Sequence, residues 1–376
     1  MKDLLELRNE IDQIDDQIVE LYEKRMQISE EVAEFKIGTG KKVFDKTREN
    51  DKLTVLTKKA ASSFTKHGIH ELFEQIMAMS RKKQYQLLTE HGMTEDLGFE
   101  MVPALDYSNA RIVFQGAEGA YTELATKKYF GDHCDSFHVS TWKDAMEAIQ
   151  NGEADYGVLP IENSSAGIVS ENYDLLVEYD NYIVGEQIIR VEHALLGLPE
   201  AELSDITNVY SHPQALMQCS EYLNAHKEWE KISVKNTAIA AKKVGGDQNI
   251  SHAAIAGKGN ADIYGLKVLE NGIEDNKGNS TRFIIVTNRK VFVEHADKIS
   301  ICFEIPHESG SLYHMLSHFI YNDLNMSKIQ SRPVKDKNWE YRFFVDFDGK
   351  LTDSAVQNAL RGLKEETASL KILGSY

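Results

Sequence analysis

Apolar residues recur at alternating steps of three and four over the first 35 positions of the chain. This spacing places them on one stripe of a helix and predicts a single long N-terminal helix that packs against a partner. One charged residue interrupts the stripe, whose members are Leu4, Leu7, Ile11, Ile14, Ile18, Leu21, Arg25, Ile28, Val32 and Phe35. A guanidinium keeps its proton in a protein, so Arg25 indicates either a site for an anion or a device that sets helix register.

The spacing of two other cations bears on these alternatives. Lys36 follows Arg25 on the same face of the helix, about 16 Å further along its axis. Two long side chains at this separation can close on a small dianion. Arg8 lies roughly 25 Å from Arg25 along the axis and about 100° around it. Arg8 can therefore serve the same pocket only from a second copy of the helix.

A second helix is predicted after the break at Gly38 and Gly40. Asp45 has the position of its N-cap, and Arg48 and Glu49 follow in the first turn. Taken alone, Arg48 is explained as a surface charge and Glu49 as a favourable charge near the positive end of the helix dipole.

A third helix is predicted from about Ile69 to Leu88. Its apolar stripe continues into Ser80 and Gln84, which are polar residues at positions that should be buried. Buried polar side chains need hydrogen-bond partners, so this helix is expected to contribute to a polar pocket.

In order and spacing, these polar residues resemble the pocket of the all-helical chorismate mutase family. That pocket contains two arginines, a lysine, an Asp-x-x-Arg-Glu cluster and a Ser-x-x-x-Gln pair. The matching residues lie in the first 90 or so positions and are Arg8, Arg25, Lys36, Asp45, Arg48, Glu49, Ser80 and Gln84. The resemblance implies an interlocked dimer of three-helix chains in which the first arginine comes from the partner subunit.

The resemblance also implies a reaction, the Claisen rearrangement of chorismate to prephenate, which needs no metal or cofactor. What it needs is a compact substrate conformer and donors to the ether oxygen, where charge develops. By resemblance, the donors are Lys36 and Gln84. The two carboxylates of the substrate would be held by Arg25, Arg48 and the partner's Arg8. The ring hydroxyl would be positioned by Asp45 and Glu49.

Composition limits the function of the remaining chain. A length of 376 residues predicts two or three domains. The net charge is −17 and residues 1–92 are nearly neutral, so the acidity lies beyond them and argues against nucleic acid or an anionic membrane as a partner. No signal peptide or membrane span is predicted. The isolated thiols of Cys134, Cys219 and Cys302 are typical of the reducing cytoplasm and form neither a zinc motif nor a disulfide framework.

Residues 93–110 have the interrupted pattern of a linker, and an α/β domain is predicted from Arg111 to Val293. Short apolar runs alternate there with helical stretches. The predicted buried strands are Arg111–Gln115, Tyr156–Ile161, Asn208–Tyr210, Ala253–Ala256 and Arg282–Thr287. Ligands of such domains bind at loops beyond the strand ends.

Four polar segments lie next to these predicted strands. Each alone is explained by turn formation, and His212 before Pro213 by helix capping. Together they indicate a site. They are residues 116–121, 162–165, 211–214 and 279–283.

The four segments resemble prephenate dehydratase over residues 111–293. The resemblance implies two lobes like those of periplasmic binding proteins, with an active site between them that converts prephenate to phenylpyruvate. Thr281 would be the essential hydroxyl and Arg282 would hold a carboxylate. The residues that would complete the site are Glu162, Asn163, Gln214 and Ser211. An ordinary threonine is a poor acid, so the resemblance does not identify the proton donor for the leaving hydroxyl.

The last 80 residues predict the order strand, helix, strand, strand, helix, strand of a ferredoxin-like α+β sandwich. The predicted elements are Ile299–Ile305, Leu312–Tyr321, Met326–Arg332, Tyr341–Asp346, Ala355–Glu365 and a short strand near Ile372. This segment, 297–376, resembles the ACT regulatory domain, which implies L-phenylalanine as an effector bound at a subunit interface. A module that only dimerises is the alternative. The effector residues would be Gly310, Ser311 and Leu312 with Gln330, Ser331, Arg332 and Pro333, although both segments depart from the family pattern.

The sequence thus predicts a multidomain, bifunctional enzyme of phenylalanine biosynthesis, cytoplasmic and a homodimer or tetramer. Its domains would be a helical mutase at 1–92, a linker at 93–110, a dehydratase at 111–293 and an ACT domain at 297–376. A prephenate dehydrogenase is disfavoured because no Gly-x-Gly-x-x-Gly follows a strand. A non-catalytic amino-acid sensor or a mutase-only enzyme remains an alternative, and Thr281 with the complete helical pocket argues against the sensor.

Overall fold

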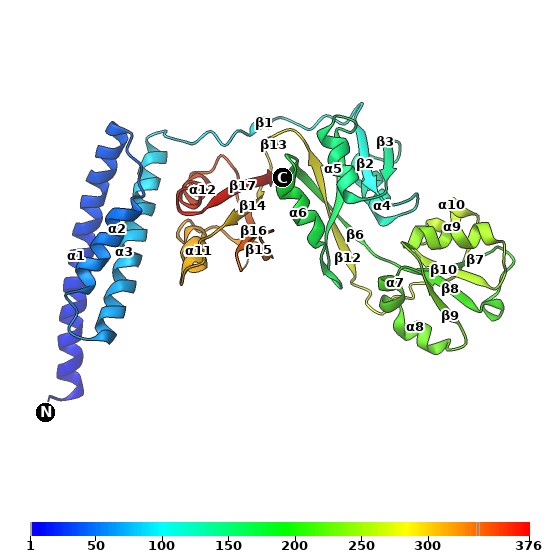
Figure 1. Ribbon diagram of the computed structural model, residues 1–376, viewed down its shortest axis with the longest axis horizontal. Coiled ribbons are helices and arrows are strands. Elements are labelled where there is room, and N and C mark those ends of the chain that lie inside the picture. The colour runs from blue at the N-terminus through cyan, green and yellow to red at the C-terminus, as the bar shows by residue number, and fades with distance from the viewer. Residues whose placement is uncertain (1, 336, 338) are drawn as a thin grey trace. The chain divides into compact units, whose positions relative to one another are not determined.

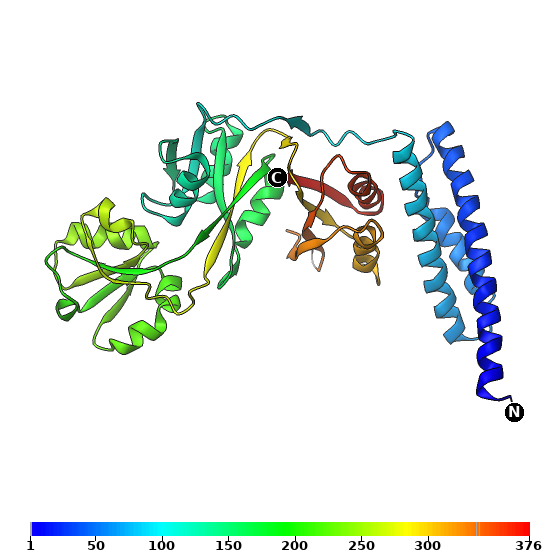
Figure 2. The same ribbon diagram turned by 180° about the vertical axis from the view of Figure 1, so that it is seen from behind.

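The computed structural model describes residues 2–335, 337 and 339–376 (Figures 1 and 2). Its contacts divide the chain into two compact units. The first unit is Met1–Leu97 with Asp297–Ile372, and the second is Gly98–Ala296 with Leu373–Tyr376. Within the described residues, no helix combines the length and the apolarity that crossing a membrane requires.

The first unit begins with the three predicted helices, α1 (Leu4–Thr39), α2 (Lys46–Thr57) and α3 (Ser63–Glu90). The helix α1 runs through Gly38, where a break was predicted, and ends at Thr39. Gly40 is its C-cap, and the left-handed φ of 67° there is easily adopted by a residue without a Cβ. Asp45 caps α2 as predicted. The helix α3 starts earlier than predicted, because Ser62 and Thr65 form a reciprocal capping box there.

The apolar stripe of α1 is largely exposed in the single chain. The exposed fraction of its aliphatic and aromatic members ranges from 39% at Val32 to 67% at Leu21. Patches of this kind on soluble proteins mark interaction surfaces. The stripe is therefore available to a second chain, as its spacing suggests.

The C-terminal part of the first unit has the predicted order of elements. They are β14 (Lys298–Glu304), α11 (Ser311–Tyr321), β15 (Met326–Pro333), β16 (Tyr341–Asp348), α12 (Ser354–Glu366) and β17 (Ser369–Ser375). The strand order is β15-β16-β14-β17, so β15 is an edge strand. Phe303, Phe319 and Phe347 are fully buried in this part of the unit. Both α11 and α12 pack against α3.

The second unit has two lobes, each built on one sheet. The first lobe has the strand order β6-β12-β4-β2-β3, with β5 paired to β4. Its strands are β2 (Arg111–Gln115), β3 (Asp135–Val139), β4 (Tyr156–Asn163), β5 (Gly167–Ile168), β6 (Tyr182–Arg190) and β12 (Ser280–Thr287). Its helices are α4 (Tyr121–Phe130), α5 (Trp142–Gln150) and α6 (Ser170–Glu178).

The second lobe has the strand order β11-β7-β10-β8-β9. Its strands are β7 (Ala194–Gly197), β8 (Asn208–Ser211), β9 (Glu230–Ser233), β10 (His252–Ala256) and β11 (Lys267–Asn271). Its helical elements are η1 (Leu203–Asp205), α7 (Pro213–Gln218), α8 (Ser220–Ala225), α9 (Thr237–Asp247) and α10 (Asn260–Tyr264). The chain passes between the lobes twice, at residues 191–193 and 272–279.

Two further pairings belong to the second unit. The short strands β1 (Glu100–Val102) and β13 (Val291–Val293) pair in parallel, and β1 lies within the segment predicted as a linker. Gly374, near the end of β17, pairs with Ile183 of β6. A Cβ on Gly374 would lie 2.0 Å from the Ile183 carbonyl oxygen, so the close approach of the two strands requires glycine.

All five strands predicted for the α/β part are present, and four of them are longer than predicted, two by a single residue and β4 and β12 by two residues each. Glu162 and Asn163 belong to β4, and Ser280 and Thr281 belong to β12, where loops were expected. The reason is the antiparallel ladder between these strands, which pairs Thr281 with Asn163 and Arg282 with Glu162. The polar residues are thus fixed by backbone pairing.

Candidate active sites

The three N-terminal helices enclose a pocket of about 530 Å³. Seven of the eight mutase residues predicted from the sequence line it. They come from α1, from α2 and its N-cap, and from α3, and are Arg25, Lys36, Asp45, Arg48, Glu49, Ser80 and Gln84. The pocket thus collects cations and carboxylates from segments separated by up to 59 positions.

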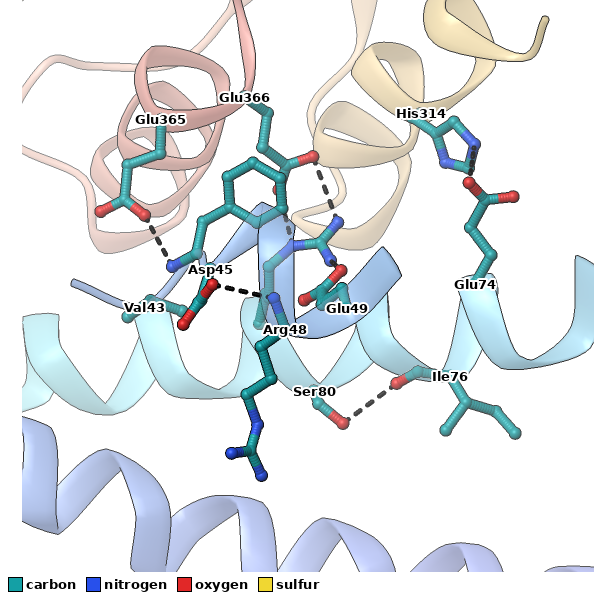
Figure 3. Close-up of polar contacts among 12 residues, drawn as sticks. Val43, Asp45, Arg48, Glu49, Glu74, Ile76, Ser80, His314, Glu365 and Glu366 are labelled. Carbon is teal, nitrogen blue, oxygen red and sulfur yellow. Dashed lines mark hydrogen bonds and ion pairs between the residues drawn. The ribbon is translucent and has the colours of Figure 1, made fainter. Parts of the chain in front are cut away.

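Arg25 is fixed by the polar positions of α3. Its Nη1 donates to Ser80 Oγ and, at 3.3 Å, to the Ile76 carbonyl oxygen. Figure 3 shows Ser80 donating in turn to Ile76, at 3.0 Å. Burial lowers the pKa of the Arg25 guanidinium, while the nearby Glu49 acts in the opposite direction. The buried Ser80 hydroxyl therefore accepts from Arg25 and donates to the Ile76 carbonyl oxygen.

Lys36 and Gln84 form the other polar contact between α1 and α3. The Lys36 ammonium donates to Gln84 Oε1 at 3.0 Å and to the Val43 carbonyl oxygen at 2.8 Å. Gln84 Nε2 donates to the Ser80 carbonyl oxygen at 3.1 Å. An ammonium has three donors and an amide nitrogen two, so each group keeps one N–H for a ligand beyond these contacts. Burial lowers the pKa of Lys36, while Glu365 and then Asp45 and Glu49 act in the opposite direction.

The first turn of α2 brings Asp45, Arg48 and Glu49 to the same pocket (Figure 3). Asp45 Oδ1 accepts from the Arg48 backbone N–H at 3.0 Å, which fixes the start of the helix. The side chain of Arg48 extends away from Glu49 and is exposed. Arg48 is therefore available to bind an anion in the open part of the pocket.

Arg8 does not line this pocket. Its side chain is exposed on α1, as expected for a residue that acts in a second copy of the chain.

Arg81 lines the pocket and was not predicted from the sequence. Its Nη1 donates to Glu49 Oε2 at 2.5 Å, and its side chain is only 9% exposed. In the sequence it begins the run Arg81-Lys82-Lys83, which is typical of a solvated helix face. The one available signal was its place directly after Ser80 on the pocket side of the helix.

In the second unit, Asn163 connects the predicted dehydratase residues. Its Nδ2 donates to Thr281 Oγ1 and to Asn279 Oδ1, both at 2.9 Å. Its Oδ1 accepts from the backbone N–H groups of Ser165 and Ala166 at 3.0 and 2.9 Å. Its Nδ2 is also 3.3 Å from the Ser280 carbonyl oxygen, so this buried amide has partners on five residues and holds the Thr281 hydroxyl in one position.

A pocket of about 380 Å³ lies beside this cluster. Both lobes and the segment 272–279 contribute to it, and its lining includes Ser165, Ala166, Gln214, Gln218, Glu274 and Asn279. Gln214 was predicted, whereas Gln218 and Glu274 were not. Gln218 Oε1 lies 3.0 Å from Nε2 of the buried His193, and burial lowers the pKa of His193. The part of the chain that the structure describes has no cluster of three or more His, Cys, Asp or Glu side chains suited to a metal ion.

Two predicted dehydratase residues make other contacts. Arg282 Nε donates to Glu186 at 2.6 Å and its Nη2 to the Tyr376 hydroxyl at 2.7 Å, and it lies across β12 from Thr281 because side chains alternate along a strand. Ser211 is fully buried and donates to the Ile255 carbonyl oxygen at 2.7 Å, within the sheet of the second lobe. His212 accepts from the Gln214 N–H, so it caps α7.

The predicted effector residues fall into two separate places. Gly310, Ser311 and Leu312 line a pocket of about 210 Å³ at the start of α11, together with His307 and Tyr341 among others. Gln330, Ser331, Arg332 and Pro333 lie on the edge strand β15 and do not line that pocket.

Comparison with known proteins gives two family matches on this chain. Residues 7–85 match chorismate mutase type II, and residues 112–291 match prephenate dehydratase. The bifunctional chorismate mutase/prephenate dehydratase of Escherichia coli strain K12 is 32% identical over 379 aligned residues, which cover 99% of this chain and 96% of the relative.

Two solved structures resemble a large part of the chain. Prephenate dehydratase from Arthrobacter aurescens in complex with L-Phe is 32% identical with a TM-score of 0.66, and covers 71% of this chain and 89% of its own. GqqA, described as a novel type of quorum quenching acylase, is 29% identical with a TM-score of 0.66, and covers 71% and 97%.

Proposed function

The chain belongs to the bifunctional chorismate mutase/prephenate dehydratase family and has both activities. We propose that its helical pocket converts chorismate to prephenate and that the cleft of its second unit converts prephenate to phenylpyruvate. The observation that carries the first half is the convergence of seven expected side chains on one pocket of about 530 Å³. The domains proposed on this basis are 1–92, 111–293 and 297–376, with a linker at 93–110.

The proposed mutase mechanism is electrostatic. Chorismate binds with its two carboxylates on Arg25, Arg48 and the partner's Arg8, while Asp45 and Glu49 orient its ring hydroxyl. The remaining N–H groups of Lys36 and Gln84 donate to the ether oxygen, where negative charge develops as the bond breaks. No group of the enzyme forms a covalent bond to the substrate. The rate gain therefore comes from holding the substrate in a compact conformer and from hydrogen-bond donors that are already in place.

The proposed active form is at least a dimer, because one chain alone leaves Arg8 far from its pocket. Two features support this form. The aliphatic residues of the α1 stripe are exposed, and β15 lies at the edge of its sheet among the described residues, where a second chain could contact it. A tetramer made by using both surfaces is compatible with the same arrangement.

The proposed dehydratase centre is Thr281 with Asn163, beside the cleft that Gln214 lines. The cleft is the place for prephenate, since it collects polar side chains from both lobes and from the segment between them. Asn163 fixes the Thr281 hydroxyl toward the ring. Glu162 is proposed to orient the substrate with them, while the contacts of Arg282 with Glu186 and Tyr376 favour a supporting role for Arg282 over direct substrate binding.

The proposed effector is L-phenylalanine, bound by the ACT domain at residues 297–376. The related dehydratase from Arthrobacter aurescens forms a complex with L-Phe. The pocket at Gly310 to Leu312 provides one wall. Because Gln330 to Pro333 lie elsewhere on the same chain, the second wall is proposed to come from another subunit, and phenylalanine then inhibits by binding across that interface.

A cytoplasmic location is proposed from the thiols. Cys134 and Cys219 carry free thiols, and Cys219 is buried. Isolated free thiols are typical of a compartment that keeps cysteine reduced.

The two sites are separated experimentally by one substitution in each. Arg25→Ala is expected to abolish conversion of chorismate while prephenate is still converted to phenylpyruvate, and Thr281→Ala is expected to do the reverse. Lys24→Ala, at an exposed neighbouring position of α1, is the control and should change neither activity. If either site variant loses both activities while remaining folded, the assignment of two separate sites is wrong.

A further inference from the structure

Arg81 lies between two carboxylates that come from distant parts of the chain. Its Nη1 donates to Glu49 of α2 at 2.5 Å. Its Nε and Nη2 donate to Oε1 and Oε2 of Glu366, at the end of α12, at 2.8 and 3.2 Å. One N–H group of the guanidinium thus binds a residue of the mutase pocket, and two others bind the C-terminal module.

This arrangement is buried and charged. The side chains of Arg81 and Glu366 are 9% and 6% exposed, and that of Glu49 is 22% exposed. The Arg81 guanidinium also lies over the ring of Phe44, 4.9 Å from its centre. A bidentate pair of this kind fixes the planar guanidinium in one orientation, which a monodentate contact does not. The position of the Glu49 carboxylate is thus set by a group that Glu366 fixes in turn.

The preceding residue of α12 holds the other side of the pocket. Glu365 Oε2 accepts from the Phe44 backbone N–H at 3.0 Å and from the Tyr85 hydroxyl at 2.8 Å. Phe44 directly precedes Asp45, the cap of α2. Glu365 also acts on Lys36, whose pKa it shifts upward against the effect of burial. Of these adjacent carboxylates of α12, Glu365 thus contacts the residue that precedes the cap of α2, and Glu366 is connected to the first turn of α2 through Arg81.

We propose that Arg81 is a positioning residue of the mutase reaction, holding the Glu49 carboxylate in place, and that Glu365 and Glu366 of the C-terminal module complete the mutase pocket. The proposal rests on the role proposed above for Glu49, which is to orient the ring hydroxyl of chorismate. Its consequence is that the C-terminal module acts directly on the first reaction of the enzyme.

The competing explanation is that these ion pairs only attach the C-terminal module to α3. The chain offers a matched control for this explanation. Lys82, the next residue of α3, donates to the carbonyl oxygen and hydroxyl of Ser317 on α11 at 3.0 and 2.7 Å, and it does not line the pocket. Lys82→Met removes an attachment contact from the same interface without touching Glu49.

The test compares mutase kcat and KM of the full-length protein carrying Arg81→Met, alone and combined with Glu49→Gln. A displacement of about 1 Å in a positioned group can reduce a rate by about 100-fold, so Arg81→Met is expected to reduce kcat by about 10- to 100-fold. If Arg81 acts through Glu49, it produces no further loss in the Glu49→Gln background. Arg81→Lys is expected to recover only part of the rate, because an ammonium cannot bind Glu366 in the bidentate manner.

The outcomes separate the proposal from its competitor. Losses that multiply in the double variant, or an equal loss in Lys82→Met, would overturn the positioning role. If Glu49→Gln by itself keeps the full mutase rate, the role proposed for Glu49 fails as well. Glu366→Gln serves if Arg81→Met does not fold, since it keeps the shape and removes the charge, and it should also lower mutase kcat. Urea unfolding followed by helical circular dichroism, measured in each variant, reports whether the helices of the first unit are folded.

Discussion

Mixing two inactive variants tests whether the mutase pocket is shared between subunits. Arg8 and Arg25 lie on the same helix, roughly 25 Å apart along its axis, and Arg8 does not line the pocket that contains Arg25. If the first arginine of each pocket comes from the partner, Arg8→Ala and Arg25→Ala damage different contributions to the site. Each variant alone is expected to be a mutase with little activity.

The size of the recovery follows from the two-fold symmetry of a dimer. In a mixed dimer, the pocket on the Arg8→Ala chain has its own Arg25 and receives a native Arg8 from its partner, whereas the other pocket lacks both arginines. Random exchange makes about half of the dimers mixed, with one intact pocket in two. Recovered activity should therefore approach about one quarter of the wild-type value.

The assay is chorismate consumption after the two variants are unfolded together, refolded and compared with each refolded alone. The control mixes Arg25→Ala with Lys36→Met. Both of these residues belong to the pocket of a single chain, so every mixed dimer has two damaged sites and no recovery is expected. If the Arg8 and Arg25 variants show no gain over the separate proteins while forming mixed dimers, Arg8 does not act from the partner and the argument from helix length is refuted.

Three further predictions concern the other sites. Burial acts to raise the pKa of Glu366, but its contacts with His318 and Arg81 outweigh burial and lower this pKa from 4.5 to about 2. The Glu366 carboxylate therefore stabilises the fold above about pH 4.5, and this contribution is lost as the pH falls toward 2. Glu366→Gln should accordingly reduce the free energy of unfolding by about 3 kcal/mol near neutral pH and about half as much near pH 3, as measured by urea unfolding with Lys364→Gln on the same helix as control. Asn163→Leu releases the Thr281 hydroxyl, and phenylpyruvate formation from prephenate should fall by about 100-fold with the mutase rate unchanged. Gly310 has a φ of 82°, so Gly310→Val should strain the start of α11 by about 1–2 kcal/mol and weaken inhibition by phenylalanine while both activities remain, and an unchanged inhibition curve would contradict the effector site.

The mutase pocket could be predicted from the sequence because its information is local. The heptad stripe, the cap at Asp45 and the buried polar positions Ser80 and Gln84 all follow from helix periodicity, and the structure brings these residues together. Arg81 could not be predicted in this way. It begins a run of three cations, and one of its two carboxylate partners, Glu366, lies more than 270 positions later in the sequence.

The residues of the proposed dehydratase cleft were predicted less completely, because their positions depend on pairing between strands that are far apart in the sequence. The polar motifs marked the right strands, but antiparallel pairing extends β4 and β12 into them and decides which face each side chain occupies. The face of the sheet that a side chain occupies depends on the register of its strand. The side chains of Thr281 and Arg282 therefore lie on opposite faces, although the two residues are neighbours in the motif. Ser211 is used by the sheet itself, and Gln218 and Glu274 reach the cleft through the fold of the segments that carry them.

The contacts of the C-terminal module give it a second role beside the proposed binding of an effector. The proposed effector pocket lies at the start of α11. The same helix contacts α3 through Ser317 and through His314, whose Nε2 is 3.5 Å from Glu74. The helix α12 contacts the mutase pocket through Glu365 and Glu366. An effector that moves either helix would shift Glu49 and Asp45 and so change the affinity of the mutase pocket for its ligand. Reciprocity then requires that a ligand in the mutase pocket change the affinity for the effector by the same factor. The charge on Arg25 that first indicated an anion site therefore belongs to a pocket whose geometry depends on the far end of the chain.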